Sequence, residues 1–213
     1  MNKKNKIALV TGASTGLGKS LSLKLALKGF KIVLASRNIE KLNSLKELIS
    51  ENGGDSQIIP TDVTKEKDVK KLYSSIEKDN VDVVVNNAGF GVFNKIQHTT
   101  IKDWDNQLNT NLRGSFLITK YISESMINRK AGKLVFINSI AGINAYPYSS
   151  AYVASKFGLR GFTSSLREEL REHNIKVISV HPGAIDTPFW NNLNVDFPSS
   201  EMLKSDDVAD VIV

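Results

Sequence analysis

Tyr152 and Lys156 lie four positions apart in a stretch with helical periodicity, so their side chains rise from one helix face, one turn apart. This spacing brings an ammonium close to a phenol, which suits proton transfer to or from a substrate oxygen. A free tyrosine titrates near pH ~10, and lowering its pKa towards ~7 requires roughly 4 kcal/mol of preferential phenolate stabilisation. By itself such a pair is more often an incidental contact on a helix surface, so its meaning depends on its surroundings.

Ser139 supplies a second reactive group in the right context. It ends an apolar run at 134–138 that has the character of a buried strand, thirteen residues before Tyr152. Because loops at the carboxyl edge of a parallel sheet face the ligand crevice, the two hydroxyls can converge there. The serine hydroxyl would then hold a substrate oxygen against the tyrosine and stabilise negative charge that develops on it.

A glycine-rich turn follows the first apolar run of the chain. It reads Thr11-Gly12-Ala13-Ser14-Thr15-Gly16-Leu17-Gly18 and leads into an apolar helix. A strand, a tight turn and a helix N-terminus present backbone N–H groups and the positive end of a helix dipole to a pyrophosphate. Glycines allow positive φ and close backbone approach. The alternative is a turn that merely tightens an ordinary strand-to-helix junction.

Both sets of residues fall at the ends of elements in an alternating pattern. Short β-branched runs alternate with longer amphipathic ones, which predicts an α/β fold: a doubly wound parallel sheet in three layers, as a single domain over 1–213. We place strands at 7–11, 31–35, 57–61, 81–86, 133–138 and 176–181. We place helices at 17–28, 39–51, 65–78, 108–129 and 151–173. Ser205 begins a last short helix that reaches Val213, so the final edge strand of such a sheet is expected to be missing, whether the chain is naturally short or truncated.

Composition narrows the chemistry. The 213 residues include no cysteine and three separated histidines (His98, His173 and His181), which argues against a metal site. The net charge of +6 comes from basic residues mixed with acids along helices, so we expect no nucleic-acid partner. No stretch approaches the roughly 18 to 20 apolar residues of a membrane span, and the basic start lacks the apolar core of a signal peptide. We therefore expect a soluble, cytoplasmic protein.

The glycine turn and the motifs that follow it in order resemble the short-chain dehydrogenase/reductase family. Its Thr-Gly-x-x-x-Gly-x-Gly turn is matched at Thr11, Gly12, Gly16 and Gly18. Further matches follow at Asp62-Val63, Asn86-Asn87-Ala88-Gly89, Asn111, Ser139, Tyr152, Lys156 and Pro182-Gly183. The resemblance covers nearly the whole chain. It implies a Rossmann-type fold and an oxidoreductase that transfers a hydride between NADP(H) and a carbonyl or alcohol, with Tyr152 as general acid/base.

The resemblance also assigns the rest of the catalytic set. Asn111, in the long central helix, is expected to position a water that links Lys156 to solvent. Lys156 is expected to bind the nicotinamide ribose and, with the positive charge of an oxidised nicotinamide, to stabilise the phenolate of Tyr152. In the reductive direction Tyr152 would protonate the substrate oxygen while Ser139 stabilises the developing charge.

NADP(H) is favoured over NAD(H) by the end of the second strand. A carboxylate there would bind the adenosine ribose and repel a 2′-phosphate, but the chain has Ser36 and Arg37 instead, a hydroxyl donor and a planar cation suited to phosphate. Arg37 could also be a solvated residue that precedes a helix. By resemblance, Asp62 accepts from the adenine amino group and Val63 packs on the ring. Asp62 could equally cap a local turn before Thr64.

The expected cofactor contacts therefore span six segments. They are Gly12, Ser14, Thr15, Gly16, Leu17 and Gly18 in the turn, Ser36 and Arg37, Asp62 and Val63, Asn87, Ala88 and Gly89 on the adenosine side of the cleft, Tyr152 and Lys156, and Pro182, Gly183, Ile185 and Thr187 near the carboxamide.

The substrate is less well defined. Apolar residues on loops that should border the site suggest an apolar or aromatic ketone or aldehyde: Phe90, Ile140, Ile143, Tyr146, Phe189 and Trp190. Some of these could simply pack on the body of the protein. Residues 187–204 mix Asn, Pro and Ser with isolated apolar anchors, which is typical of a mobile substrate lid.

Two other functions remain compatible with this fold. One is a catalytically idle NADP(H) sensor or scaffold, although such a protein would have no chemical need for all four members of the set Asn111, Ser139, Tyr152 and Lys156. The other is an epimerase or dehydratase, whose relatives usually carry a larger C-terminal substrate domain. The resemblance further implies a homodimer or homotetramer, with helices 108–129 and 151–173 in one interface.

Overall fold

The computed structural model describes residues 6–76, 80–193 and 198–213. Its centre is a six-stranded, fully parallel sheet in the order β3-β2-β1-β4-β5-β6. The strands are β1 (Ile7–Thr11), β2 (Lys31–Ser36), β3 (Ser56–Pro60), β4 (Val83–Asn86), β5 (Gly132–Ile137) and β6 (Ile175–Val180). Each lies within two residues of its expected position, so the Rossmann-type fold expected from the sequence is confirmed. Parallel strands covered on both faces read as nearly continuous apolar runs, which made these strands easy to find.

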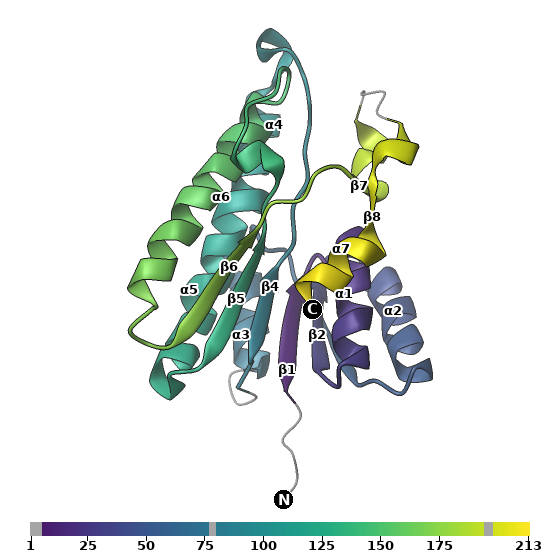
Figure 1. Ribbon diagram of the computed structural model, residues 1–213, viewed down its shortest axis with the longest axis vertical. Helices are drawn as coiled ribbons and strands as arrows, with labels where there is room; N and C mark the ends of the chain where they lie inside the picture. The colour runs from purple at the N-terminus through teal and green to yellow at the C-terminus, as the bar shows by residue number, and fades with distance from the viewer. Residues whose placement is uncertain (1–5, 77–79, 194–197) are drawn as a thin grey trace, which may run out of the picture.

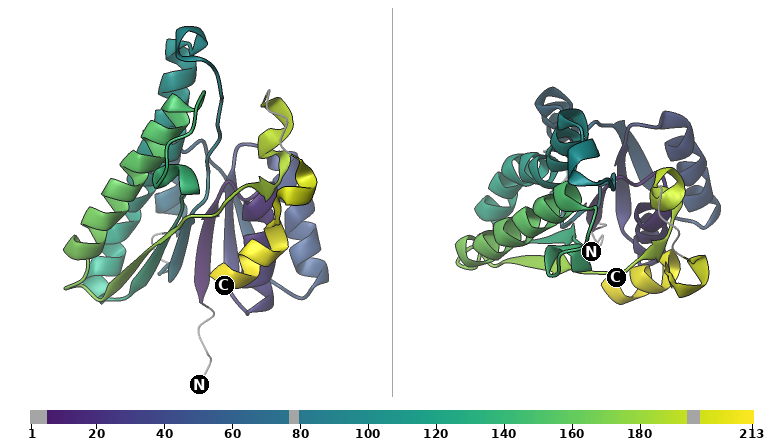
Figure 2. Two further views of the ribbon diagram at one scale, coloured as in Figure 1. Left: turned by 45° about the horizontal axis from the view of Figure 1, so that its top comes forward. Right: turned by 90° about the horizontal axis from the view of Figure 1, so that it is seen from above.

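Side chains alternate across the sheet to feed two separate cores. On β1, Leu9 packs with α3 (Glu66–Ile76), α5 (Gly114–Arg129) and α6 (Ser150–Glu169). Its neighbour Val10 packs on the other face with α1 (Gly16–Leu27), α2 (Ile39–Glu51) and α7 (Ser205–Ile212). Figures 1 and 2 show the resulting three layers, with the green and teal helices on one side of the sheet and the purple and yellow ones on the other.

The prediction of one long helix at 108–129 was wrong in its start and its continuity. The structure has α4 (Ile101–Leu108), then a π-helical turn η2 (Asn109–Arg113), then α5. Helix α4 was not expected, although Thr100 caps it by accepting from the N–H of Asp103 at 3.0 Å. Only Gln107 of α4 is buried, although Ile101, Trp104 and Leu108 have the spacing of one helix face, a signal that the sequence analysis overlooked.

Smaller differences occur at the other helices. The helix expected to end at His173 ends at Glu169, and 77–78 of the helix expected at 65–78 lie outside the described residues. Before α6 come two 3₁₀ turns, η1 (Ile96–His98) and η3 (Ile140–Gly142).

After β6 the chain crosses the end of the sheet and returns to its first half (Figure 1). It forms β7 (Ile185–Asp186), the 3₁₀ turns η4 (Pro188–Asn192) and η5 (Ser199–Glu201), and β8 (Leu203–Lys204), which pairs with β7. Helix α7 begins at Ser205, which was expected to be its N-cap, while Lys204 takes the N-cap position. The helix docks on α1 with a 2.7 Å ion pair between Lys24 and Asp210. Among the described residues no helix is long and apolar enough to cross a membrane.

Candidate active site

The glycine turn is built so that backbone groups approach closely. Gly12 has φ +62° and Gly16 φ +51°, a left-handed conformation that favours glycine. A Cβ at Gly12 would lie 2.9 Å from the Cα of Ala88, and one at Gly18 would overlap the carbonyl oxygen of Gly12 and lie 2.5 Å from Asn87 Nδ2. The glycines therefore let the turn pack directly against the loop after β4 and against its own backbone, in a form that side chains would disrupt.

Thr11 and Asn87 hold the turn and the loop together. The hydroxyl of Thr11 accepts from the backbone N–H groups of Asn87 at 3.0 Å and Ala88 at 3.1 Å. In return, Asn87 Nδ2 donates to the carbonyls of Thr11 at 2.9 Å and Gly12 at 3.2 Å. The Asn87 side chain, expected on the adenosine side of the cleft, is thus occupied in fixing the turn.

The end of β2 lies beside the same turn. Ser36 Oγ donates to Ser14 Oγ at 2.8 Å, so two expected cofactor residues are brought together. Arg37 is exposed and contributes a positive charge near Asp62.

Asp62 performs the local capping that the sequence left open. Its Oδ1 accepts from the backbone N–H of Thr64 at 3.1 Å and from the Thr64 hydroxyl at 2.7 Å. Burial opposes ionisation, but these hydrogen bonds, with Arg37 and Lys65 nearby, leave the pKa of the carboxyl below its usual value. The second oxygen, 3.6 Å from Lys65 Nζ, stays on the open side of the turn.

Tyr152, Ser139 and Lys156 converge at the carboxyl edge of the sheet. Ser139 caps η3 beyond β5, and its side chain lies close enough to the Tyr152 hydroxyl to lower the pKa of the phenol. Lys156 Nζ lies 5.6 Å from the centre of the Tyr152 ring and donates to the carbonyl of Ile137 at 3.0 Å. The three side chains share one small region, as expected from their places in the sequence.

The lowered tyrosine pKa expected from the sequence depends on an oxidised nicotinamide as well as on Lys156, and it stays a prediction. Burial raises the pKa of Tyr152 to about 12, against a smaller lowering by the hydrogen bond from Ser139. Burial also lowers the pKa of Lys156 to about 8. In the protein alone, Tyr152 is therefore a protonated phenol at neutral pH, because burial disfavours its charged phenolate.

Asn111 lies in the π turn and is fully engaged. Its Oδ1 accepts from the N–H of Phe90 at 3.0 Å, and its Nδ2 donates to the carbonyl of Phe90 at 3.0 Å and to Ser155 Oγ at 2.9 Å. Ser155 in turn donates to the carbonyl of Tyr152 at 2.7 Å. The Asn111 side chain therefore supports the Tyr152 backbone and the loop after β4, and its water-positioning role stays a prediction.

The loop at 182–187 reaches the glycine turn through Thr187, and its expected contact with the carboxamide of the cofactor stays a prediction. The Thr187 methyl and Cβ would lie 3.0 Å from a Cβ at Gly16. Pro182 accepts from the N–H of Ile140 at 3.0 Å, so the loop is also fastened to the segment that carries Ser139.

His181 is a site residue that sequence reasoning missed. Its Nδ1 lies 3.0 Å from the carbonyl oxygen of Ser139 and its Nε2 3.0 Å from Ser179 Oγ. The signal was its position directly before Pro182-Gly183, at the end of the strand next to the one that leads to Ser139.

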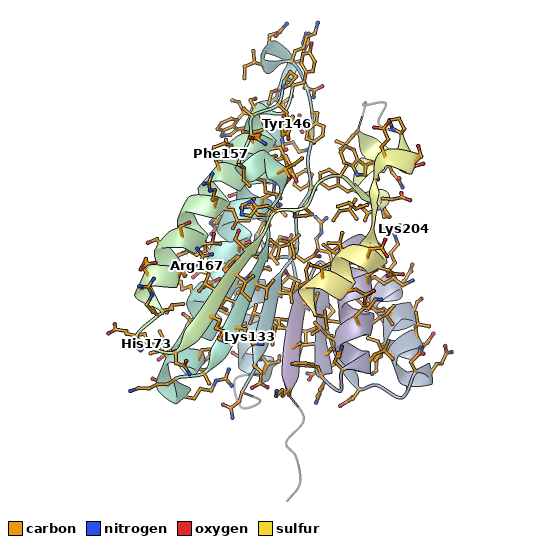
Figure 3. All side chains as sticks on the ribbon, viewed as in Figure 1. Lys133, Tyr146, Phe157, Arg167, His173 and Lys204 are labelled. Carbon is orange, nitrogen blue, oxygen red and sulfur yellow. The ribbon has the colours of Figure 1, made fainter. Side chains whose placement is uncertain are left out.

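Tyr152 belongs to a cluster of four aromatic rings. Phe93, Phe189 and Trp190 form a cluster with Tyr152 in which ring centres lie 5.4 to 6.4 Å apart. Phe189 and Trp190 were expected near the site, but Phe93 was not. Ile140, Ile143 and Tyr146 are exposed by 38 to 47%, and Figure 3 shows Tyr146 near the start of α6.

Known proteins share both the sequence pattern and the fold. The model of the short chain dehydrogenase family matches residues 6–197. A protein named sepiapterin reductase from Chlorobaculum tepidum is 33% identical over 97% of this chain and 88% of its own length. A metagenomic short-chain oxidoreductase solved in complex with NADP is 32% identical, with a TM-score of 0.85 over 97% of this chain and 88% of that one. An alcohol dehydrogenase from Thermococcus sibiricus, complexed with 5-hydroxy-NADP, is 26% identical, with a TM-score of 0.90 over the same shares.

Proposed function

Because this chain belongs to the short-chain dehydrogenase family, we propose that it is an NADP(H)-dependent oxidoreductase that interconverts a carbonyl and an alcohol, with Tyr152 as the proton-transferring group. The observation that carries the proposal is the convergence of Tyr152, Ser139 and Lys156 beside a glycine turn. The NADP and 5-hydroxy-NADP complexes of two similar structures support the choice of cofactor.

The residues present fit this cofactor. The glycine turn has the compact, left-handed form at Gly12 and Gly16 and leads directly into the N-terminus of α1, where backbone N–H groups would hold a pyrophosphate. Arg37 is exposed and permanently charged beside the Ser14–Ser36 hydroxyl pair, where a 2′-phosphate would be held. The contacts proposed on either side follow the resemblance: Thr15, Gly16 and Leu17 in the turn, Asp62, Val63, Ala88 and Gly89 towards the adenosine, and Lys156, Gly183, Ile185 and Thr187 towards the nicotinamide.

The protein's own part in the reaction is to hold the substrate oxygen and move one proton. A bound nicotinamide supplies or accepts the hydride. The Ser139 hydroxyl orients the substrate oxygen, and the Tyr152 hydroxyl gives its proton to that oxygen during reduction. With a pKa of about 12 in the protein alone, Tyr152 is ready as a donor at neutral pH. Oxidation needs the phenolate, and the cation at Lys156 is the resident group that favours it.

The first test is cofactor binding. NADPH and NADH are titrated in parallel against the wild type and Arg37→Glu, with Lys46→Glu as a control for the same change of charge on an exposed position of α2. Loss of a charge-assisted contact to the 2′-phosphate should weaken NADPH about tenfold or more and leave NADH nearly unchanged. Equal binding of both nucleotides to Arg37→Glu and wild type would contradict the proposed phosphate site.

Turnover separates the enzyme from the idle sensor. With NADPH bound, a carbonyl screen compares the wild type with Tyr152→Phe, which keeps the ring and removes the proton donor. A sensor gives no turnover in either protein, whereas the proposed enzyme loses its turnover only in the variant.

We assign residues 187–204 as the substrate lid, of which 194–197 lie outside the described residues. Its support is that Phe189 and Trp190 of this segment pack on Phe93 and Tyr152 while the segment is fastened at both ends, by β7 pairing with β8.

We also propose a homodimer or homotetramer built on α5 and α6. Phe116 on α5 is 43% exposed and Phe157 on α6 is 41% exposed, and Figure 3 shows Phe157 on the outward side of α6. Light scattering on the purified protein tests this. Phe157→Glu should give monomers if these helices form the interface.

A further inference from the structure

The ring of Phe189 lies against the reactive tyrosine. Its centre is 5.8 Å from that of Tyr152, 6.4 Å from Phe93 and 5.4 Å from Trp190. Phe93 also meets the edge of Tyr152 at 5.5 Å. Any group attached to the reacting carbon of a substrate must lie beside the Tyr152 ring, since the hydroxyl of that ring has to reach the adjoining oxygen. Phe189 therefore occupies space next to the reaction.

Gly91 makes that space available. A Cβ on this residue would lie 2.9 Å from Phe189 Cζ, 3.0 Å from Phe93 Cε1 and 3.3 Å from Tyr152 Cδ2. One added methyl would thus press on three rings at once. The φ of Gly91 is not in the positive range that favours glycine, so the backbone does not require glycine at this position. The missing side chain has a spatial effect: it lets the rings of Phe189, Phe93 and Tyr152 all approach Gly91 closely.

The two lid aromatics are held differently. Trp190 donates from Nε1 to the carbonyl of Ile185 at 2.8 Å, which fixes its indole to β7. The phenyl ring of Phe189 has no polar atom, and its backbone N–H meets the Thr187 hydroxyl only at 3.4 Å. The Phe189 side chain can therefore rotate away without breaking a hydrogen bond, whereas the hydrogen bond of Trp190 keeps its indole in place beside the site.

We propose that Gly91, Phe93 and Trp190 form an aryl-binding slot beside Tyr152, that Phe189 fills it in the absence of substrate, and that the substrate is a carbonyl compound with a flat aromatic group next to the reacting carbon. This inference rests on the proposed carbonyl reduction. The walls present aromatic faces and edges, and a flat ring that replaces Phe189 gains the contacts that Phe189 gives up.

Turnover of two matched methyl ketones tests the slot. Acetophenone and butanone share the reacting group and differ by phenyl in place of ethyl. In the wild type, acetophenone should have a KM about tenfold lower than butanone. Gly91→Ala should raise the KM of acetophenone about tenfold and that of butanone far less, because the added methyl enters the slot. Equal effects on both ketones would overturn the slot.

Phe189→Ala tests whether substrate displaces the Phe189 ring or stacks against it. If substrate displaces Phe189, removing the ring abolishes that cost, and the KM of acetophenone should fall about threefold. A rise in KM would mean that Phe189 itself stacks on the substrate, and the proposal would be wrong.

Binding without turnover provides an independent readout. The chain has two tryptophans, so Trp104→Phe leaves Trp190 as the sole reporter. Trp104 lies on α4 and has no part in the site. With NADPH present, benzyl alcohol should change the Trp190 emission saturably, propanol should not, and Gly91→Ala in the same background should weaken the response to benzyl alcohol about tenfold.

The two proposals fail in different ways. NADPH binding and butanone turnover without any preference for aryl ligands overturn the slot alone. A saturable, Gly91-dependent fluorescence response without turnover supports the slot and overturns the proposed reaction.

Discussion

His181 donates a hydrogen bond from Nδ1 to the carbonyl oxygen of Ser139 across 3.0 Å. A carbonyl can only accept, so Nδ1 carries the proton and Nε2 accepts from Ser179 Oγ at 3.0 Å. The imidazole therefore connects Ser139, the residue that we propose orients the substrate, to the end of β6. We regard His181 as a positioning residue, since it acts through Ser139.

Substitution of His181 should distinguish the effect of its hydrogen bond to Ser139 from the effect of the packing of its ring. The amide nitrogen of Asn can occupy the place of Nδ1, whereas that of Gln reaches the place of Nε2. His181→Asn should keep kcat within about threefold, and His181→Gln should lower it about tenfold with little change in KM, because a displaced Ser139 loses interactions made in the transition state. Steady-state kinetics with acetophenone gives the split. Similar losses in both variants would show that only the packing of the ring counts.

Gly18 should be intolerant of a single methyl group. In Gly18→Ala the new Cβ meets the carbonyl oxygen of Gly12 and the amide of Asn87, so the turn must open. NADPH affinity should drop about a hundredfold, and the free energy of unfolding should fall by about 2 kcal/mol, as for other strained backbone substitutions. Isothermal titration and urea unfolding measure the two effects.

Gly161 provides the matched control for that substitution. It lies in α6 with open space where a Cβ would be. Gly161→Ala should leave NADPH binding unchanged and raise the free energy of unfolding by about 0.5 to 1 kcal/mol, because alanine restricts the unfolded chain and favours the helix. If both alanine variants bind NADPH equally well, close approach at Gly18 is unimportant.

Lys156→Met should exchange activity for stability. Burial lowers the pKa of Lys156 from 10.5 to about 8, so at pH 7 folding holds a charge where it is disfavoured. Replacing the ammonium by a thioether should raise the free energy of unfolding by roughly 2 kcal/mol, after allowance for the lost hydrogen bond to Ile137, and should abolish turnover.

The pH dependence of that gain has a definite sign. Below about pH 8 the lysine is charged in both states and the full penalty applies. Between about pH 8 and 10.5 the unfolded chain binds more protons than the folded one, so the wild type gains stability as pH rises and the advantage of methionine shrinks. Urea unfolding at pH 7 and pH 10 measures the difference. An advantage that stays constant between these two pH values would show that the buried charge of Lys156 is not its cause.

The parallel sheet could be read from the sequence because buried strands such as β1 and β4 are short apolar runs with a glycine or a polar residue at each end. Helix α4 was not predicted from the sequence; it is short, and only Gln107 of its eight residues is buried. The π turn escaped because one inserted residue changes helical phase without changing composition. Local pattern therefore predicts which segments pack on the sheet, but not how a helix is interrupted.

Much of the site could be predicted for a similar reason: Tyr152, Lys156 and the glycine turn act through local spacing. The contacts that were missed join segments far apart in the chain. His181, after β6, contacts Ser139, after the neighbouring strand β5. Phe93, on the loop after β4, contacts Phe189 in η4. Such pairs become visible only when the fold brings them together.

The π turn also sets the direction in which the Asn111 side chain leaves the helix axis. An α-helix turns about 100° per residue, so the extra residue at Asn109–Arg113 lets α4 and α5 each keep its own buried face while Asn111 points at Phe90. Deleting one residue of the turn would yield a smoother helix whose two halves are out of phase by that angle. The extra residue of the π turn thus adjusts the rotation of α4 relative to α5. A sequence optimised only for helix propensity would lose this rotation and, with it, the position of Asn111.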